Sequence, residues 1–225
     1  MKKKLNIKYR LILPIALLGI VALISNILAV SNIKNVNDNA ANIADNYMEG
    51  RTQLAKIHQS VMNIHKMALS HIVATDYNTM ITLVNDIKEE EKKLDGMLTE
   101  YEIYITNDDR ETYNALLSDY DSLKHALVFL VCASASGKTQ DAYAFANGDV
   151  ASFNTAVENN IAVLDNSISS RTTQARAQLS SVYLSSMITN SASALTCIIL
   201  VFTTVSLILR SVVKPIKNIL ETLRG

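Results

Sequence analysis

Two hundred consecutive residues without proline separate Pro14 from Pro215, the two prolines of this 225-residue chain. Only six glycines accompany them, so proline and glycine together make up about 4% of the residues, against an average near 12%. Sandwiches, barrels and α/β folds need glycine- and proline-rich turns every ten or so residues. Because such turns are scarce here, we expect an all-α structure made of long helices.

Two uncharged runs have the length of transmembrane helices. Residues 11–30 form twenty residues without a charge, enough to cross roughly 30 Å of hydrocarbon at about 1.5 Å per residue. A cleaved signal peptide is the alternative, but its apolar core is usually shorter, about 7–15 residues, and ends in small residues. The first run instead continues in a helical pattern, which favours an uncleaved span. Residues 190–209 form a second uncharged run and predict a second span.

The charges are distributed asymmetrically around these runs, although 21 basic residues balance 21 acidic ones overall. Residues 1–10 and 210–225 hold nine of the basic residues and one of the acidic ones, which leaves a net charge of −8 in residues 31–189. The positive-inside rule therefore predicts a multi-pass protein of the inner (plasma) membrane, with both termini cytoplasmic and 31–189 outside. Basic ends around an acidic middle argue against nucleic-acid binding. Cys132 lies in the external segment and Cys197 in the second span, so we expect no disulfide between them.

The external segment carries the pattern of a helical bundle. Core-type residues recur there with alternating steps of three and four, which is typical of a helix seam. Four seams, over 33–68, 81–105, 113–130 and 150–182, are separated by polar turn formers at 75–78, 106–109 and 147–149. Asn107 or Asp108 is placed to cap the third helix. Short turns between amphipathic helices predict an up-down-up-down four-helix bundle flanked by the two transmembrane helices.

The sequence contains no complete catalytic or metal-binding motif. The run from Ser136 to Thr139 resembles the end of a phosphate-binding loop, but that motif needs a glycine where Cys132 stands, and a preceding strand. We interpret the run as an irregularity in the third helix. No two of the four histidines are three or four residues apart, so they predict no metal site on one helix face. We expect no enzymatic activity, no metal and no cofactor.

The residues after the second span carry a family resemblance. Residues 210–225 place Pro215 and Ile216 before Ile219, Leu220 and Leu223, an arrangement that resembles the first helix of a HAMP linker. Residues 144–153, AFANGDVASF, resemble the turn before the last helix of the four-helix-bundle sensor family. Together with the order of spans and bundle, the chain resembles the N-terminal half of a methyl-accepting chemotaxis receptor.

The resemblance implies a receptor that binds a small extracytoplasmic ligand, works as a homodimer and passes a helix displacement through the second span to HAMP. Pro215, at the junction, would be a signal-transmission residue. A chemotaxis kinase complex would be reached through a cytoplasmic region that residues 1–225 do not include, so we expect a fragment, a truncated product, or a chain that signals in a different way. The sensor part of a histidine kinase or cyclase, or a non-sensing membrane-anchored scaffold or interaction protein, are the alternatives.

Two arginines are candidate ligand-binding residues. Arg171 occupies a seam position where an apolar residue would be usual, and a count of about 24 residues from the distal turn places Gly50 and Arg51 at a similar level. With Gly50 leaving space and Thr172 nearby, the two guanidiniums suit a carboxylate ligand bound by bidentate hydrogen bonds.

A ligand-free interpretation of the same residues is equally open. Arg171 would then extend out of the bundle, or pair with Glu49 or Glu102. The sequence alone does not choose between these interpretations.

Overall fold

A computed structural model describes residues 7–216 of the chain, and within them the structure is helical without a strand. The α-helices are α1 (Ile7–Asn42), α2 (Glu49–Val73), α3 (Tyr77–Tyr101), α4 (Arg110–Ala135), α5 (Thr139–Phe145) and α6 (Ala151–Ile208). Short π-helical segments lie at Ile43–Met48, Ala146–Val150 and Leu209–Val213, and a 3₁₀ turn at Glu102–Tyr104. Parts of the two predicted terminal segments, residues 1–6 and 217–225, fall outside the described residues.

The chain divides into two compact units. The first, called the bundle below, is Ala41–Arg176. The second, called the two-helix unit, consists of the described parts of Met1–Ala40 and Ala177–Gly225. The all-α prediction is confirmed, and so is the prediction of two long apolar helices flanking a four-helix bundle.

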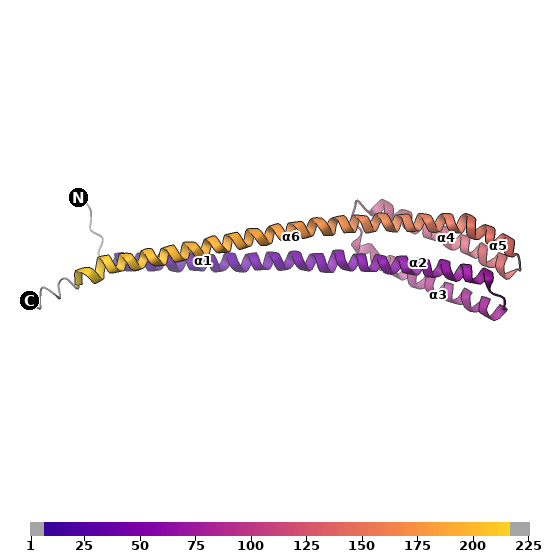
Figure 1. Ribbon diagram of the computed structural model, residues 1–225, viewed down its shortest axis with the longest axis horizontal. Helices are drawn as coiled ribbons and strands as arrows, with labels where there is room; N and C mark the ends of the chain where they lie inside the picture. The colour runs from indigo at the N-terminus through magenta and orange to yellow at the C-terminus, as the bar shows by residue number, and fades with distance from the viewer. Residues whose placement is uncertain (1–6, 217–225) are drawn as a thin grey trace, which may run out of the picture. The chain divides into compact units, whose positions relative to one another are not determined.

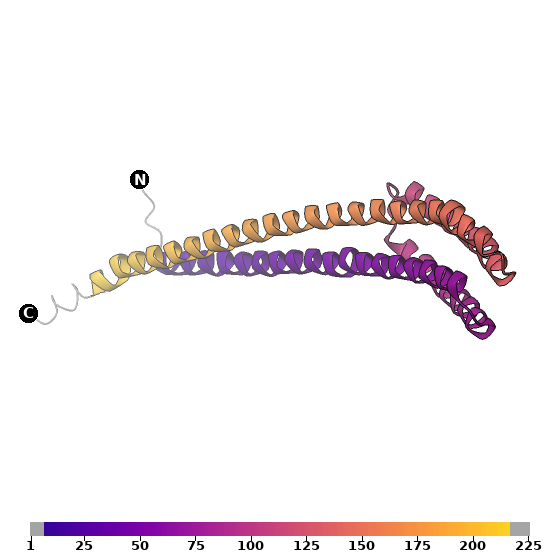
Figure 2. The same cartoon turned by 45° about the vertical axis from the view of Figure 1, so that its right-hand side comes forward.

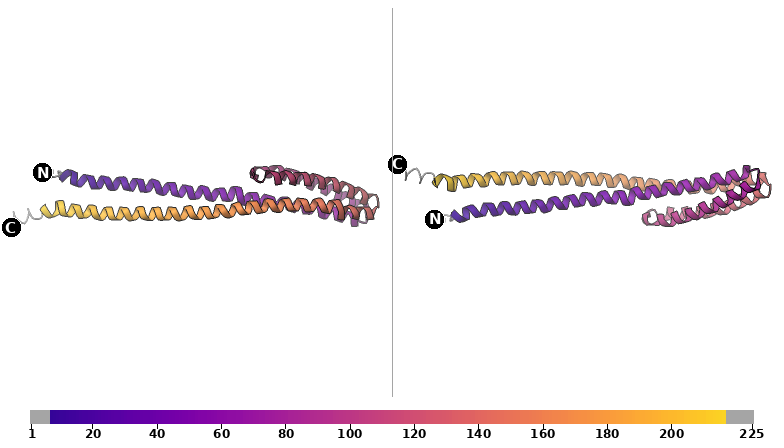
Figure 3. Two further views of the ribbon diagram at one scale, coloured as in Figure 1. Left: turned by 90° about the horizontal axis from the view of Figure 1, so that it is seen from above. Right: turned by 90° about the horizontal axis from the view of Figure 1, so that it is seen from below.

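The bundle is built from α2, α3, α4 and the first part of α6, with α3 against α2 and α4 against α6 (Figures 1 and 3). Polar contacts join the neighbouring helices, among them Arg51 with Asp165, Ser60 with Glu90, Lys124 with Asp95, and Asn160 with Asp119. The predicted seams supply the core, which includes Leu54, Ile57, Val61, Ile64, Leu94, Leu98, Leu116, Leu123, Leu127, Leu130, Val157, Ile161, Leu164 and Ile168, all at most 5% exposed. Each large apolar side chain buried in this way contributes about 1.5–3 kcal/mol, so the seams provide most of the stabilisation.

The first two turns fall where the sequence predicts them. Asp76 caps α3 by accepting a hydrogen bond from the Thr79 amide at 2.8 Å. The second connection covers residues 102–109, and Asp109, rather than Asn107 or Asp108, stands at the N-cap position of α4. The Asp109 side chain makes no capping bond, because its carboxylate points towards α6 instead.

The third connection differs from the prediction. The helix ends at Ala135, and Gly137 takes the left-handed conformation with φ +71°. The Lys138 amide donates to the Ala133 carbonyl, and the Gly137 amide to the Ser134 carbonyl, both at 3.0 Å. This is the Schellman arrangement that satisfies the last carbonyls of a helix. The interpretation of residues 136–139 as a mere irregularity is therefore wrong: they end α4, and α5 leads to the kink at Gly148.

The two-helix unit pairs α1 with the second part of α6 (Figure 2). Polar side chains meet across the pair: Ser25 contacts Ser193 and lies 3.8 Å from the Cys197 sulfur, and Asn32 donates to Asn190 at 3.4 Å. Each helix contains a window apolar and long enough to cross a membrane, and none of either window is buried inside the structure. Such side chains suit contact with lipid. Cys132 and Cys197 are both free.

Candidate functional site

A cleft of about 380 Å³ opens on the bundle between α2 and α6. Its charged and titratable lining residues are Arg51 and His58 on α2 and Glu158 and Asp165 on α6, and its floor is apolar, with Leu54 and Ile161. The volume lies within the range of small-molecule sites, and a few polar groups over an apolar floor are typical of such sites. We call it the α2–α6 cleft.

Arg51, a predicted ligand residue, lines this cleft and already holds a carboxylate of the chain. Its Nε donates to Asp165 Oδ1 at 2.8 Å and its second guanidinium nitrogen to Oδ2 at 3.2 Å, a bidentate pair. Both side chains are accessible to water, with 55% of Arg51 and 37% of Asp165 exposed. An exposed pair of this kind contributes only about 0.2–1 kcal/mol. Asp165 can therefore leave Arg51 at little cost in free energy.

Arg171 lies elsewhere, in a polar cluster at the α3–α4 connection. It is six residues beyond Asp165 on α6, which is about 9 Å along the axis, so the structure does not bring it together with Arg51. Its partner is Asp109, which accepts from the guanidinium at 2.7 Å, and neither Glu49 nor Glu102 occupies that place. Thr172 donates to the Ile168 carbonyl of its own helix at 2.8 Å. Arg171 and Thr172 do not line the α2–α6 cleft.

Asp109 is the centre of this cluster, and its side chain is only 6% exposed. Ser167 donates to Oδ1 at 2.6 Å and Thr106 to Oδ2 at 2.8 Å, in addition to the bond from Arg171. Burial alone would raise the pKa of Asp109, but the hydrogen bonds from Ser167 and Thr106 and the charge of Arg171 together hold that pKa below its ordinary value. We call Thr106, Asp109, Ser167 and Arg171 the Asp109 cluster. It fastens the α3–α4 connection to α6.

The space that Gly50 was expected to leave for a ligand is taken by a side chain. A Cβ atom at Gly50 would lie 3.0 Å from the Tyr104 ring, so the absence of that atom lets the ring lie against α2. Tyr104 packs in turn on the buried Tyr101, with ring centroids 5.8 Å apart. Gly50 therefore serves the packing of the α3–α4 connection. No local pattern around residue 104 predicts that Tyr104 fills this position.

Comparison with known protein families identifies the kind of domain that contains these two sites. The chain matches the family described as a four helix bundle sensory module for signal transduction over residues 4–183, about four-fifths of its length. It belongs to this family. No curated protein and no solved structure matches the chain. The module is that of methyl-accepting chemotaxis proteins, a sensory family rather than a catalytic one, so a sensory role is supported.

One buried histidine gives the sensory module an acid-sensitive point. His71 on α2 is 1% exposed, and its Nδ1 lies 2.9 Å from Ser134 Oγ. Because the Ser134 hydroxyl donates its proton to the His71 carbonyl at 3.1 Å, Nδ1 must be the donor to Ser134, and Nε2 is left as a bare acceptor. Nε2 is buried without a partner among the described residues. Burial, which penalises the charged imidazolium, lowers the pKa of His71 below 6.5.

We expect acid to destabilise the module through His71. Because the pKa is lower in the folded state, the unfolded chain takes up the proton first, so stability is full above about pH 6.5 and falls as the pH drops below it. The melting temperature of the full chain in detergent, measured between about pH 7.5 and 5, should decline less in His71→Gln than in the parent. His125→Gln is the matched control, since His125 is exposed. An unchanged decline in His71→Gln would assign it to other groups.

Proposed function

We propose that this chain provides the sensory part of a transmembrane chemotaxis receptor. The bundle binds a small extracytoplasmic molecule, and the displacement passes along α6 to the HAMP-like residues 210–225. The observation that carries this proposal is the continuity of α6: one helix, Ala151–Ile208, contains both the α6 residues of the α2–α6 cleft and the second apolar window. A hydrogen-bonded helix is stiff along its axis, so a shift beside Asp165 is passed on towards Ile208.

Pro215 is placed to modify that signal. A proline has no amide donor for the carbonyl four residues before it, here Ser211. That carbonyl lies in the π-helical segment Leu209–Val213, where the Lys214 amide bonds to the Leu209 carbonyl five residues back. Such π segments are frequent at functional positions. The receptor then acts as a homodimer and reaches a chemotaxis kinase complex through a cytoplasmic output region, as the family resemblance implies.

The ligand proposed for the α2–α6 cleft carries a carboxylate. The free-energy cost of breaking the ion pair with the present carboxylate partner differs between Arg51 and Arg171. Releasing Asp165 from Arg51 breaks an exposed pair of about 0.2–1 kcal/mol. Releasing Asp109 from Arg171 would leave a carboxylate that is nearly fully buried, at several times that cost. Arg51 is therefore the residue that a carboxylate ligand engages, and Arg171 serves structure.

Thermal stabilisation of the full chain in lipid nanodiscs tests this assignment. We expect at least one member of a panel of small carboxylic acids to raise the melting temperature, because a ligand at 100 times its dissociation constant stabilises by about 2.7 kcal/mol. Their primary amides should not. Arg51→Gln should abolish the shift, whereas Arg110→Gln should preserve it, since Arg110 also holds an exposed acid, Glu102, but lies outside the cleft. A shift that survives in Arg51→Gln, or a panel without any shift, contradicts the carboxylate site.

The proposed topology places the bundle outside the cell and both termini inside. Cys132 is exposed on α4 and serves as a natural reporter. In intact cells an impermeant maleimide should label the parent chain, and Cys132→Ser should lose the label. A cysteine introduced at Lys3 of the Cys132→Ser chain should react only after the membrane is opened. Labelling of position 3 in intact cells would reverse the proposed orientation.

A further inference from the structure

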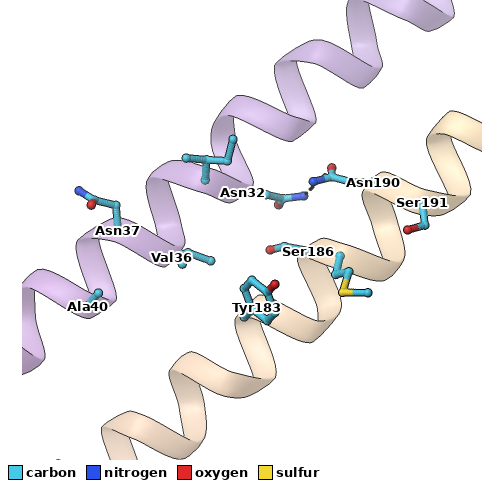
Figure 4. A pocket seen from close by; sticks show the side chains of 10 residues that line it. Asn32, Val36, Asn37, Ala40, Tyr183, Ser186, Asn190 and Ser191 are labelled. Carbon is cyan, nitrogen blue, oxygen red and sulfur yellow. Dashed lines mark hydrogen bonds between the residues drawn. The ribbon is translucent and has the colours of Figure 1, made fainter.

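A second cleft, of about 510 Å³, lies in the two-helix unit between α1 and α6 (Figure 4). We call it the α1–α6 cleft. Asn32 and Asn190 reach towards each other at one end of it, and Val36 and Ser186 point into the space between the helices. Its volume falls in the range of small-molecule sites. It shares no residue with the α2–α6 cleft.

None of the ten residues that line this cleft carries a charge. The end at Asn32 and Asn190 offers two carboxamides. The rest offers apolar surface from residues such as Val36 and Met187, with the polar groups of Asn37, Tyr183 and Ser186 among them. The hydrogen bond from Asn32 Nδ2 to Asn190 Oδ1 is long, at 3.4 Å, and uses one donor and one acceptor. A carboxamide has two donors and an oxygen with two lone pairs, so the pair can also bind one further hydroxyl group. A charged molecule would lose its hydration here without gaining a partner of opposite charge.

The position of the cleft in the chain indicates where its occupant comes from. The lining on α1 begins two residues after the uncharged run 11–30, and on α6 it ends at the start of the run 190–209. Both runs expose large apolar side chains, such as Ile27 at 69% and Phe202 at 69%. A molecule dissolved at the membrane surface, with its polar group towards water, is delivered at this level.

We propose that the α1–α6 cleft is a binding site for an uncharged amphipathic molecule of the medium-chain alcohol class, taken up from the membrane surface. The hydroxyl group bonds to the Asn32–Asn190 pair, and the alkyl chain lies on Val36 and Met187. A molecule bound there contacts both α1 and α6. Its binding would therefore give the receptor a second input. The proposal rests on the membrane assignment made above but not on the carboxylate site.

Photolabelling of the full chain in lipid nanodiscs tests the proposal. The probe is 3-azioctanol, an alcohol that carries a photoreactive diazirine, and the labelled residues are read by mass spectrometry. We expect saturable labelling concentrated in residues 32–40 and 183–191, displaced by 1-octanol but not by octanoate. Ser186→Leu fills the space between the helices with a larger side chain. It should reduce the labelling by about fivefold or more, because the alkyl chain of the probe is then excluded from the cleft. Ser185→Leu, one position away and outside the cleft, is the matched control.

Several results would overturn the proposal. Labelling that does not saturate, that spreads along both spans, or that is the same in Ser186→Leu and Ser185→Leu means that the probe reports lipid contact alone. A chain that lacks its native cysteines and carries Val36→Cys tests whether a second copy covers the cleft instead. Oxidation of that chain to a disulfide-linked dimer, together with absent labelling, assigns the surface to a dimer contact. If Cys132 of the parent chain reports the proposed topology in intact cells, such a failure leaves the receptor assignment standing.

Discussion

Replacing Asp109 with alanine is expected to lower the stability of the bundle by roughly 3 kcal/mol, because it removes one partner of a largely buried ion pair. The carboxylate accepts hydrogen bonds from Thr106, Ser167 and Arg171. Without it, the Arg171 side chain, which is only 23% exposed, loses the acid with which it pairs. For a chain of this size the melting temperature should fall by roughly 6–12 °C. Circular dichroism of the full chain in detergent measures the change.

Asp165→Ala is the matched control for this variant. Asp165 also pairs with an arginine of the bundle, at 2.8 Å, but that pair is exposed and its loss should cost at most about 1 kcal/mol. Asp109→Asn separates the effect of the charge from that of the side chain's shape. The asparagine amide has the same size as the carboxylate, and its oxygen can still accept the hydrogen bond from Ser167. Equal losses in Asp109→Ala and Asp165→Ala would mean that the Asp109 cluster does not fasten the α3–α4 connection to α6.

The sequence predicted the helices well because the seam pattern depends only on local spacing. Residues such as Leu54, Leu94 and Leu164 follow steps of three and four, and the buried face follows directly from those steps. The end of α4 could also have been found, because Gly137 followed by Lys138 fits the rule that helices end with glycine in the left-handed conformation.

The pairing of the two arginines could not be predicted in the same way. Asn107, Asp108 and Asp109 are adjacent polar residues, and only the packing of the α3–α4 connection decides which of them turns towards α6. Asp109 and Arg171 are 62 positions apart, so no local pattern links them. The signal that did exist was Arg171 itself, a charge at a seam position, because a buried charge needs a partner. That signal identified an unusual site but not whether its partner belongs to the chain or to a ligand.

Aromatic side chains pack at the α3–α4 connection, close to the Asp109 cluster. Tyr101→Ala should lower the free energy of unfolding by about 3–5 kcal/mol, the range for removing a large buried ring. Tyr101 is 1% exposed at the end of α3, and its ring lies 5.8 Å from that of Tyr104 and 6.3 Å from that of Tyr113, between centroids. Its removal leaves a cavity and also frees Tyr104, which otherwise lies against Gly50. Thermal unfolding of the full chain in detergent measures the loss.

Tyr77→Ala provides the comparison, because it makes the same substitution at the other end of the same helix. Tyr77 is 70% exposed, so its loss should change the free energy of unfolding by no more than about 0.5 kcal/mol. The difference between the two variants isolates burial from helix propensity, which is the same change in both. If Tyr101→Ala were as mild as Tyr77→Ala, the end of the bundle nearest the α3–α4 connection would be loosely packed. Arg171 could then leave Asp109 as easily as Arg51 leaves Asp165, and the choice of Arg51 as the ligand residue would lose its energetic basis.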